Sequence, residues 1–418
     1  MSLITSLTRM WLTRSIKPFI FSNEYDNQLP FEECSNLGLY VHIPFCRSIC
    51  NFCPYCKVKY SEAECNRYID ALIKEIRLVG KQGIDKKEVT SLYFGGGTPA
   101  LALSRIGEIV HAIKEYFTIT EGIGLELHPN DVTVPVLETL KCAGITKISI
   151  GIQSFSRKYQ DIIGRGAIDI SAIKEALSKV HFETVSMDFI FALPEQTFED
   201  LRKDIDIAFA IGANHIAIYP FIDFTFTAST VEAIGKKQKR RLMDEITNYC
   251  LKKGYVRRSI WTFSSESDAG YSSMTRDNFL GFGCSATTLL KRQFKINTFS
   301  VEEYCRRIDN RQLPTSLTLH FSMRQRMIYW LFWTAYSTEV NAEDFKKFFG
   351  KSLIRLYGLE LKIAKLLGFI TEKEGSYRLT LKGAFYYHYY ENFYTLSYID
   401  KMWGIMRSEA FPAKMVLK

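Results

Sequence analysis

The sequence predicts an α/β fold of six strand–helix units, followed by a smaller α-rich domain. Six short apolar runs alternate with amphipathic stretches of helical length, which is typical of βαβ units and a parallel sheet. From about residue 321 the composition changes to aromatic-rich helical segments, which indicates a second unit. Six units fall short of the eight that close a complete barrel.

The composition is that of a globular protein with reduced cysteines. The chain has 418 residues, is 47% hydrophobic and carries a formal net charge of +9. This charge fits an anionic substrate or a weak affinity for nucleic acid, without establishing either. No apolar run reaches the length of a membrane span, and no secretory signal is evident. The ten cysteines therefore predict a reducing, cytoplasmic location.

The N-terminal segment has its own composition. Residues 1–23 contain no acidic residue and carry Arg9, Arg14 and Lys17, which resembles an organellar transit peptide. We favour the alternative, an amphipathic arm over residues 1–37 that covers the catalytic domain. The further domains are expected at 38–255 (barrel), 256–320 (barrel extension) and 321–418 (C-terminal domain).

Each predicted strand is an apolar run, and a helical stretch follows it. The strands are expected at 39–43, 89–94, 123–127, 147–152, 184–192 and 215–220. The helices are expected at 62–79, from about 104, and at 132–142, 170–180 and 198–210. In barrels of this kind the chemistry lies at the C-terminal ends of the strands, and the unusual polar motifs fall there.

Beyond the strand–helix units, a basic helix is expected at 231–254 and a strand at 257–263. The basic residues of this helix form a solvated face or a docking patch for an electron donor; they are Lys236, Lys237, Lys239, Arg240 and Arg241. Helices at 323–336, 341–349 and 353–367 with a short hairpin predict a winged helix. Its third helix has few basic residues, so we expect a lid over the barrel mouth and no nucleic-acid partner.

A loop after the first strand carries Cys46, Cys50, Cys53 and Cys56. In the spacing C-x3-C-x2-C, three thiolates can bind three corners of an iron–sulfur cube and leave the fourth iron open. A zinc knot would need a second Cys or His pair at a matching interval, and none is evident. Cys56 is either a fourth ligand or a bystander, and we favour the bystander.

Together with the preceding Tyr-Val-His-Ile-Pro-Phe, this motif resembles the signature of the radical S-adenosylmethionine (SAM) superfamily. Within it, the chain resembles the branch of oxygen-independent coproporphyrinogen III oxidase (HemN) over roughly residues 38–385. The resemblance implies a partial (β/α)6 barrel of the TIM type with a C-terminal winged-helix-like domain. It also implies a [4Fe–4S] cluster on Cys46, Cys50 and Cys53, whose electron cleaves SAM to a 5′-deoxyadenosyl radical.

Further motifs at successive strand ends match SAM-binding positions of the family. Gly95-Gly96-Gly97-Thr98-Pro99 resembles its glycine-rich turn, and Leu280 to Ala286 resembles its Leu-Gly-x-Gly-x-x-Ala stretch. Arg165 can pair with the SAM carboxylate, and Asp188, inside an apolar strand, needs a partner such as a ribose hydroxyl. The resemblance assigns the SAM site to Tyr40, Gly96, Gly97, Thr98, Glu126, Gln153, Arg165 and Asp188.

Three activities stay open within the branch. The first is coproporphyrinogen III oxidase-like oxidative decarboxylation of a tetrapyrrole propionate, in porphyrin biosynthesis. The second is methylation of an aromatic substrate by a class C radical SAM methyltransferase that uses a second SAM. The third is a haem-binding chaperone. The chaperones' His-Asn-x-x-Tyr-Trp motif is absent from 271–278, and Pro54-Tyr55-Cys56 departs from the oxidases' Gly-x-Cys.

Two expectations concern partners of the reaction. A flavodoxin- or ferredoxin-type protein is expected to supply the electron. The C-terminal tail could line a substrate pocket, although core packing is the simpler interpretation of its aromatic residues; the side chains concerned are His388, Glu391, Tyr394, Tyr398 and Trp403.

Overall fold

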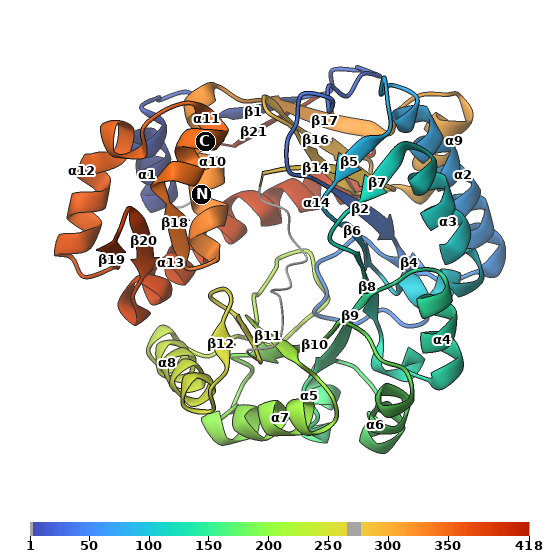
Figure 1. Cartoon of the computed structure of the whole chain (residues 1–418), viewed down its shortest axis with the longest axis horizontal. Coiled ribbons are helices and arrows are strands. Elements are labelled where there is room, and N and C mark those ends of the chain that lie inside the picture. Colours follow the sequence, from blue (N-terminus) through green and yellow to red (C-terminus); the bar gives the residue numbers. More distant parts are fainter. Residues whose placement is uncertain (1–2, 266–276, 418) are drawn as a thin grey trace.

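The framework of the molecule is one twisted sheet of 14 strands, seen near the centre of Figure 1. The computed structural model describes residues 3–265 and 277–417. All six predicted strands are present and run parallel. They are β2 (Leu37–Ile43), β6 (Leu92–Gly96), β8 (Ile123–Leu127), β9 (Lys147–Gln153), β10 (Thr184–Phe191) and β11 (His215–Pro220). A seventh parallel strand, β14 (Asn278–Phe282), pairs with β2, so the predicted partial barrel is confirmed.

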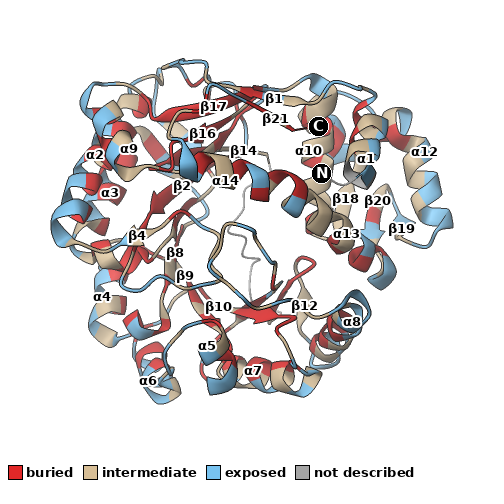
Figure 2. Ribbon diagram, turned by 180° about the vertical axis from the view of Figure 1, so that it is seen from behind, coloured by how far each residue is buried: buried red, intermediate tan, exposed pale blue. Residues whose placement is uncertain are grey.

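Helices cover the outer face of this parallel sheet (Figure 1), and their buried sides face the strands (Figure 2). They are α2 (Glu62–Gly80), α3 (Leu103–Tyr116), α4 (Val134–Cys142), α5 (Arg157–Ile162), α6 (Ile170–Lys179), α7 (Phe198–Ala210) and α8 (Lys236–Lys252). The helix expected at 231–254 begins only at Lys236, because Gly235 has extended backbone angles at its N-cap. Lys236, Lys237, Arg240 and Arg241 are exposed, as expected for a solvated face, and Lys236 and Arg240 also lie over the rings of Tyr389 and Phe385.

Antiparallel strands continue the sheet at both edges. The strand expected at 257–263 is in fact two, β12 (Val256–Arg257) and β13 (Thr262–Ser264), because a turn reverses the chain between them. At the other edge lie β15 (Thr287–Leu289), β16 (Gln293–Asn297), β17 (Thr315–His320), β1 (Phe19–Ser22) and β21 (Lys414–Leu417). Strand β1 pairs with β21, so the N-terminal and C-terminal segments lie side by side.

The C-terminal helices and hairpin form the predicted winged helix. Its helices are α10 (Met323–Tyr336), α11 (Ala342–Phe349) and α12 (Leu353–Leu366), and β18 (Glu339–Asn341), β20 (Ser376–Leu379) and β19 (Ile370–Lys373) form its small sheet. Trp330, Phe345 and Tyr357 belong to a core separate from that of the barrel. This arrangement confirms the expected α-rich domain, whereas the domain boundaries stay a prediction.

Three further segments complete the region beside the winged helix. These are α13 (Leu381–Tyr394), a π-helical turn at Thr395–Ile399 and α14 (Asp400–Ser408). The N-terminal helix α1 (Leu3–Thr13) contacts α10 and α13, so the arm packs on the C-terminal region. Short elements complete the chain: β3 (Phe45–Cys46), β4 (Val58–Lys59), β5 (Lys87–Val89), β7 (Phe117–Ile119) and α9 (Val301–Asp309).

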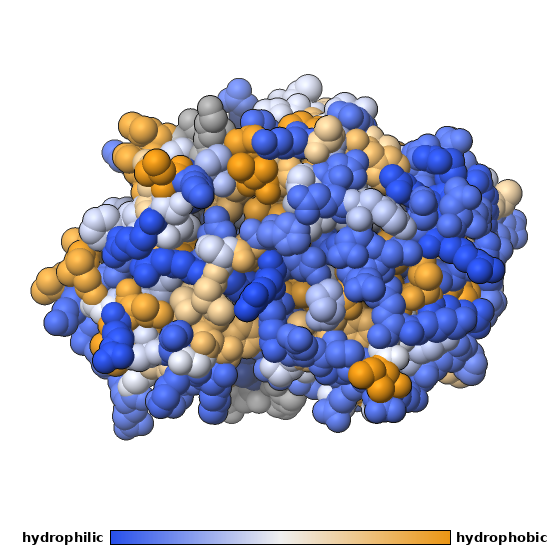
Figure 3. Space-filling view, turned by 90° about the horizontal axis from the view of Figure 1, so that it is seen from above, coloured by the Kyte–Doolittle hydropathy of each residue, from blue (hydrophilic) through white to orange (hydrophobic). Residues whose placement is uncertain are grey.

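No described helix combines the length and the hydrophobicity that crossing a bilayer requires. Seen from above, the surface is mostly hydrophilic, and hydrophobic side chains form separate patches (Figure 3).

Candidate active site

A large cavity lies between the C-terminal ends of the parallel strands and the C-terminal helices. Its volume is about 1290 Å³. A pocket for one drug-sized ligand measures about 300–1,000 Å³, so this cavity has room for more than one ligand. All the residues predicted for the cluster and for SAM line it: Tyr40, Cys46, Cys50, Cys53, Gly96, Gly97, Thr98, Glu126, Gln153, Arg165 and Asp188.

The cysteine loop is closed at its base by backbone hydrogen bonds. Strand β3 pairs with β4, and the Tyr60 amide donates to the Cys46 carbonyl oxygen at 2.9 Å. The Lys57 ammonium donates to the carbonyl oxygens of Cys50 (3.3 Å) and Cys53. These bonds hold the loop so that three half-buried sulfurs face the cavity.

The spacing of the three sulfurs distinguishes a cluster from a single ion. Among the described residues, only His42, Cys56 and Cys284 place three His, Cys, Asp or Glu ligand atoms within 4.8 Å of one another. The sulfurs of Cys46, Cys50 and Cys53 therefore do not all lie within 4.8 Å of one another, whereas thiolates on one tetrahedral zinc ion lie about 4 Å apart. A wider spacing fits a four-iron cube, because each thiolate binds a different iron.

Burial and the neighbouring Cys53 thiol raise the pKa of Cys46 to about 11. The Cys46 thiol therefore keeps its proton until a metal displaces it.

The glycine turn packs directly against the start of the cysteine loop. A Cβ on Gly96 would lie 2.5 Å from His42 Cε1, and one on Gly97 would lie 2.5 Å from the Phe45 carbonyl oxygen. Gly96 also has a φ of +116°, which side chains disfavour. The Thr98 amide donates to the Phe45 carbonyl oxygen at 2.7 Å. Glycine is needed at Gly97 because two backbone segments touch, and at Gly96 because of its φ angle and the His42 ring.

Two half-buried carboxylates face the cavity from neighbouring parts of the sheet. Glu126 accepts hydrogen bonds from the Gly96 amide (3.1 Å) and the Tyr93 hydroxyl (3.2 Å). Asp188 accepts hydrogen bonds from the Ser149 hydroxyl at 2.9 and 3.0 Å. Burial raises the pKa of Glu126, and burial together with the charge of Glu126 raises the pKa of Asp188 to about 7. A cationic ligand would stabilise the charged form of both carboxyl groups and so lower their pKa values.

Gln153 is the last residue of β9, and Arg165 follows α5, the next helix. Arg165 donates from Nε to the Cys50 sulfur at 3.4 Å and from Nη1 to the Gly151 carbonyl oxygen, which links the strand end to the cysteine loop. Gln153 adopts a φ of +70°, a strained conformation for a side-chain-bearing residue. Its amide lies over Gly151, where an added Cβ would be 3.1 Å away. Such strain is often found at functional sites.

Tyr40 belongs to a hydrogen-bonded series that the sequence did not reveal. Its hydroxyl lies 3.0 Å from His42 Nδ1, and His42 Nε2 lies 3.0 Å from the Cys56 carbonyl oxygen. Sequence reasoning missed His42, although alternation along β2 places it on the same face as Tyr40. It also missed Ser149, because an isolated serine in a strand carries no motif.

The wall opposite the barrel is formed mostly by aromatic rings. Four of the tail residues named above line the cavity: Glu391, Tyr394, Tyr398 and Trp403. The fifth, His388, lies edge-on against Trp261 at 4.6 Å and is buried. Further rings come from β1, β16 and α10 and include Phe19, Phe294, Tyr329, Phe332 and Trp333. We call the aromatic residues that line this side of the cavity the aromatic wall: Phe19, Phe294, Tyr329, Phe332, Trp333, Tyr387, Tyr390, Tyr394, Tyr398 and Trp403.

A buried cation of α1 also reaches this cavity. Arg9 is 7% exposed and lines the cavity beside Phe19. Its Nη1 donates to the Lys17 carbonyl oxygen, while its buried Nε has no hydrogen-bond partner. Within residues 3–265 and 277–417, no carboxylate oxygen lies within 4.0 Å of this guanidinium. Sequence reasoning assigned Arg9 only to a basic arm, because nothing local indicates that it points inward.

Comparisons with known proteins agree with this geometry. The sequence pattern of the Radical SAM superfamily matches residues 40–208. The heme chaperone HemW of Bacillus subtilis (strain 168) is 25% identical over 362 residues, which are 82% of this chain and 95% of that protein. An oxygen-independent coproporphyrinogen III oxidase of Pseudomonas aeruginosa is 23% identical over 322 residues, 70% of each chain.

A solved structure shares the fold. Coproporphyrinogen III oxidase (HemN) from Escherichia coli superposes with a TM-score of 0.76 at 20% sequence identity, over 91% of this chain and 97% of that one. The partial barrel and the C-terminal region therefore have a counterpart of known structure. In the stretch where the chaperone motif was sought, residues 271–276 lie outside the described residues.

Proposed function

Because this chain belongs to the radical SAM superfamily, in the branch of HemN and HemW, we propose that Cys46, Cys50 and Cys53 hold a [4Fe–4S] cluster. When bound together, the cluster and SAM supply reductive cleavage of the sulfonium bond and a 5′-deoxyadenosyl radical. The spread of the three sulfurs and their position at the cavity support this assignment.

We further propose that the polar strand ends bind SAM. Glu126 and Asp188 are half-buried with raised pKa values, and a bound cation would stabilise both carboxylates in their charged form. Arg165 offers a planar donor group to the SAM carboxylate, and Gln153 can bind ribose hydroxyls. Tyr40 and the turn at Gly96, Gly97 and Thr98 complete the site from the two preceding strands. Their common role is to orient SAM and to exclude water.

The substrate that the cavity supports best is a tetrapyrrole, and the reaction is coproporphyrinogen III oxidase-like oxidation. The observation that carries this proposal is the aromatic wall, which lines the same cavity as the cysteine loop, and this cavity is larger than SAM alone requires. Aromatic rings bind flat macrocycles by offset stacking.

Arg9 supports an acidic substrate. Arg9 is buried and forms no ion pair within the described residues, so its guanidinium can pair with an anion that a ligand supplies. A propionate of the macrocycle would do so, and bidentate pairing suits a guanidinium. The expected electron donor of flavodoxin or ferredoxin type and the cytoplasmic location stay predictions.

A haem chaperone is the second candidate. The matched HemW of Bacillus subtilis is named a heme chaperone and aligns over 95% of its length, which favours this role. The same aromatic wall would accommodate haem. The methyltransferase alternative gains no support from the relatives described above.

One experiment separates the two roles. The anaerobically reconstituted protein is incubated with SAM, a reductant and coproporphyrinogen III, and the products are measured by mass spectrometry and carbon dioxide release. Release of 5′-deoxyadenosine with carbon dioxide supports the oxidase.

A parallel titration with haem, followed by absorbance, tests the chaperone. Stoichiometric haem binding without decarboxylation would replace the first proposal by the second. If 5′-deoxyadenosine is released but coproporphyrinogen III is not decarboxylated and haem is not bound, the tetrapyrrole substrate is rejected. The proposed cluster and SAM site would still stand.

A further inference from the structure

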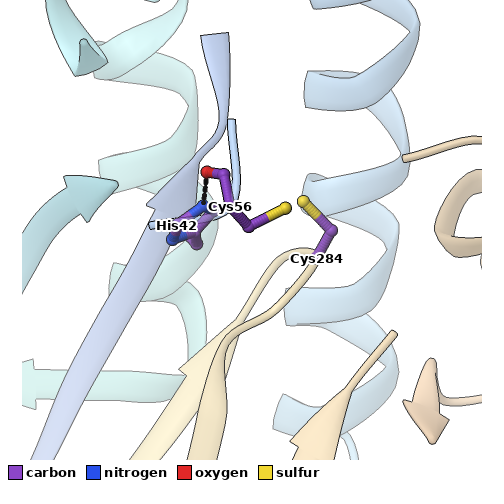
Figure 4. Close-up of side chains that lie close together, drawn as sticks. All are labelled: His42, Cys56 and Cys284. Atoms are coloured by element: carbon purple, nitrogen blue, oxygen red, sulfur yellow. Dashed lines mark hydrogen bonds between the residues drawn. The ribbon is translucent and has the colours of Figure 1, made fainter. Parts of the chain in front are cut away.

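Cys56 lies beside a second cysteine that is remote in sequence. Its sulfur points toward that of Cys284, which follows β14, and both lie near His42 (Figure 4). The ligand atoms of these three residues lie within 4.8 Å of one another, and all three residues are buried. The C-x3-C-x2-C motif contains neither cysteine.

Both cysteines are held in place by hydrogen bonds of their own backbone. The Cys56 carbonyl oxygen lies 3.0 Å from His42 Nε2, and the Cys284 amide donates to the Tyr68 hydroxyl at 2.9 Å. The same hydroxyl donates to the His42 carbonyl oxygen at 2.8 Å, which ties the two sides together. The adjacent Gly283 amide donates to Glu75 at 2.7 Å. The two thiols therefore meet in a fixed arrangement.

The hydrogen bonds of His42 disfavour a metal ion at this position. A carbonyl oxygen only accepts, so Nε2 carries the proton that is donated to Cys56, and Nδ1 accepts from the Tyr40 hydroxyl. Both ring nitrogens are thus occupied, and two thiols remain. A structural zinc site needs four protein ligands, and a catalytic one needs three.

The two thiols differ in their access to the cavity. Cys56 is 6% exposed and lines the cavity, whereas Cys284 is 0% exposed. A small oxidant in the cavity therefore meets Cys56 first. The neighbouring Cys284 thiol and His42 lower the pKa of Cys56, which favours the reactive thiolate, whereas burial raises the pKa of Cys284.

We propose that Cys56 and Cys284 form a reversible disulfide whose oxidant is a low-molecular-weight disulfide entering from the cavity. The Cys56 thiolate attacks one sulfur of the oxidant, which breaks its S–S bond, forms a mixed disulfide and releases one thiolate. The Cys284 thiol then loses its proton and attacks the Cys56 sulfur, which releases the second thiolate. The two cysteines lose two electrons and two protons, and the oxidant becomes two thiols.

The bond would fasten the end of the cysteine loop to the barrel. Cys56 comes three residues after Cys53, and Cys284 follows a strand that pairs with β2. This would give Cys56 a role distinct from that of a fourth cluster ligand.

The test uses the full-length protein with its cluster reconstituted under anaerobic conditions. The protein is equilibrated with mixtures of oxidised and reduced glutathione, free thiols are alkylated, and the digest is mapped by mass spectrometry. We expect a Cys56–Cys284 cross-linked peptide in most chains at the oxidising end, and its loss when reduced glutathione is added. In Cys284→Ser the cross-link should disappear, and Cys56 should retain glutathione.

Cys250→Ser, which removes a buried cysteine of α8, is the matched control and should leave the cross-link unchanged. The wild-type map tests the proposal even if Cys284→Ser does not fold. Both thiols alkylated at every ratio, or Cys56 linked to Cys53 instead, would overturn it. Zinc bound at one equivalent by the wild type and lost in Cys56→Ser would also overturn it, in favour of a metal site.

Discussion

The barrel mouth and the aromatic wall face the same cavity, but they are built from different kinds of residue. The mouth consists of polar side chains at the ends of β2, β6, β8, β9 and β10, each fixed by backbone or side-chain hydrogen bonds. The wall consists of rings contributed by β1, β16, α10, α13, the π-helical turn and α14. The mouth can therefore fix a polar cofactor with precision, whereas the wall offers a broad apolar surface to a bulky substrate.

The largest effect is expected from a substitution that removes the cluster from the mouth and leaves the aromatic wall unchanged. Cys46→Ala should reduce cluster iron from roughly four atoms per chain to near zero. Release of 5′-deoxyadenosine should stop, because two thiolates on one loop cannot hold the cube. Iron analysis and product assay measure this, with Cys142→Ala on the exposed side of α4 as the control. A Cys46→Ala protein that keeps its iron would disprove the ligand assignment, and unchanged porphyrin binding would show that the wall acts independently.

A smaller effect concerns the pH dependence of the mouth. The pKa of Asp188 is raised to about 7 in the folded chain, against about 3.9 in an unfolded one. The folded chain keeps the proton that the unfolded chain loses, so this stabilisation is complete below about pH 4 and is lost as the pH rises through about 7. The ligand-free wild type should lose about 3 kcal/mol of unfolding free energy relative to Asp188→Asn between pH 5 and pH 8.

Urea denaturation of both proteins at the two pH values measures this difference. Glu138→Gln, at an exposed position of α4, is the control and should show no pH-dependent difference from the wild type. Parallel pH profiles for wild type and Asp188→Asn would mean that Asp188 is ionised in the folded chain. Bound SAM should flatten the profile, because a nearby cation lowers the pKa of a carboxyl group.

The smallest expected effect tests the wall. Arg9→Gln should weaken the binding of a porphyrin dicarboxylic acid about 10-fold, since a hydrogen bond to a charged group contributes about 1.5 kcal/mol or more. Binding of the corresponding dimethyl ester should not change, because the ester has no anion for the guanidinium. Fluorescence titration measures both affinities. Arg14→Gln is the control, since Arg14 is more exposed and pairs with Glu360. Equal losses of affinity for the acid and the ester would disprove the pairing of Arg9 with a substrate carboxylate.

The sequence was most informative where function depends on residues close together in the chain. The alternation of apolar runs with helical stretches predicted the parallel strands, and the cysteine spacing, the glycine turn and the polar residues after apolar runs predicted residues that line the mouth. The sequence provided no prediction for contacts between residues that are far apart in the chain. The pairing of β1 with β21, the inward position of Arg9 and the approach of Cys284 to Cys56 have no local signal.

The physical reason lies in what fixes each feature. A strand end, a left-handed glycine or a C-x3-C-x2-C loop is determined by backbone geometry over a few residues, so the sequence by itself determined the barrel units and the mouth. The sequence does not distinguish an aromatic residue of the core from one that lines a binding cavity, because both positions favour apolar and aromatic side chains. Only tertiary packing, which brings α1, α13 and α14 across from the barrel, decided that these rings and Arg9 face the cavity.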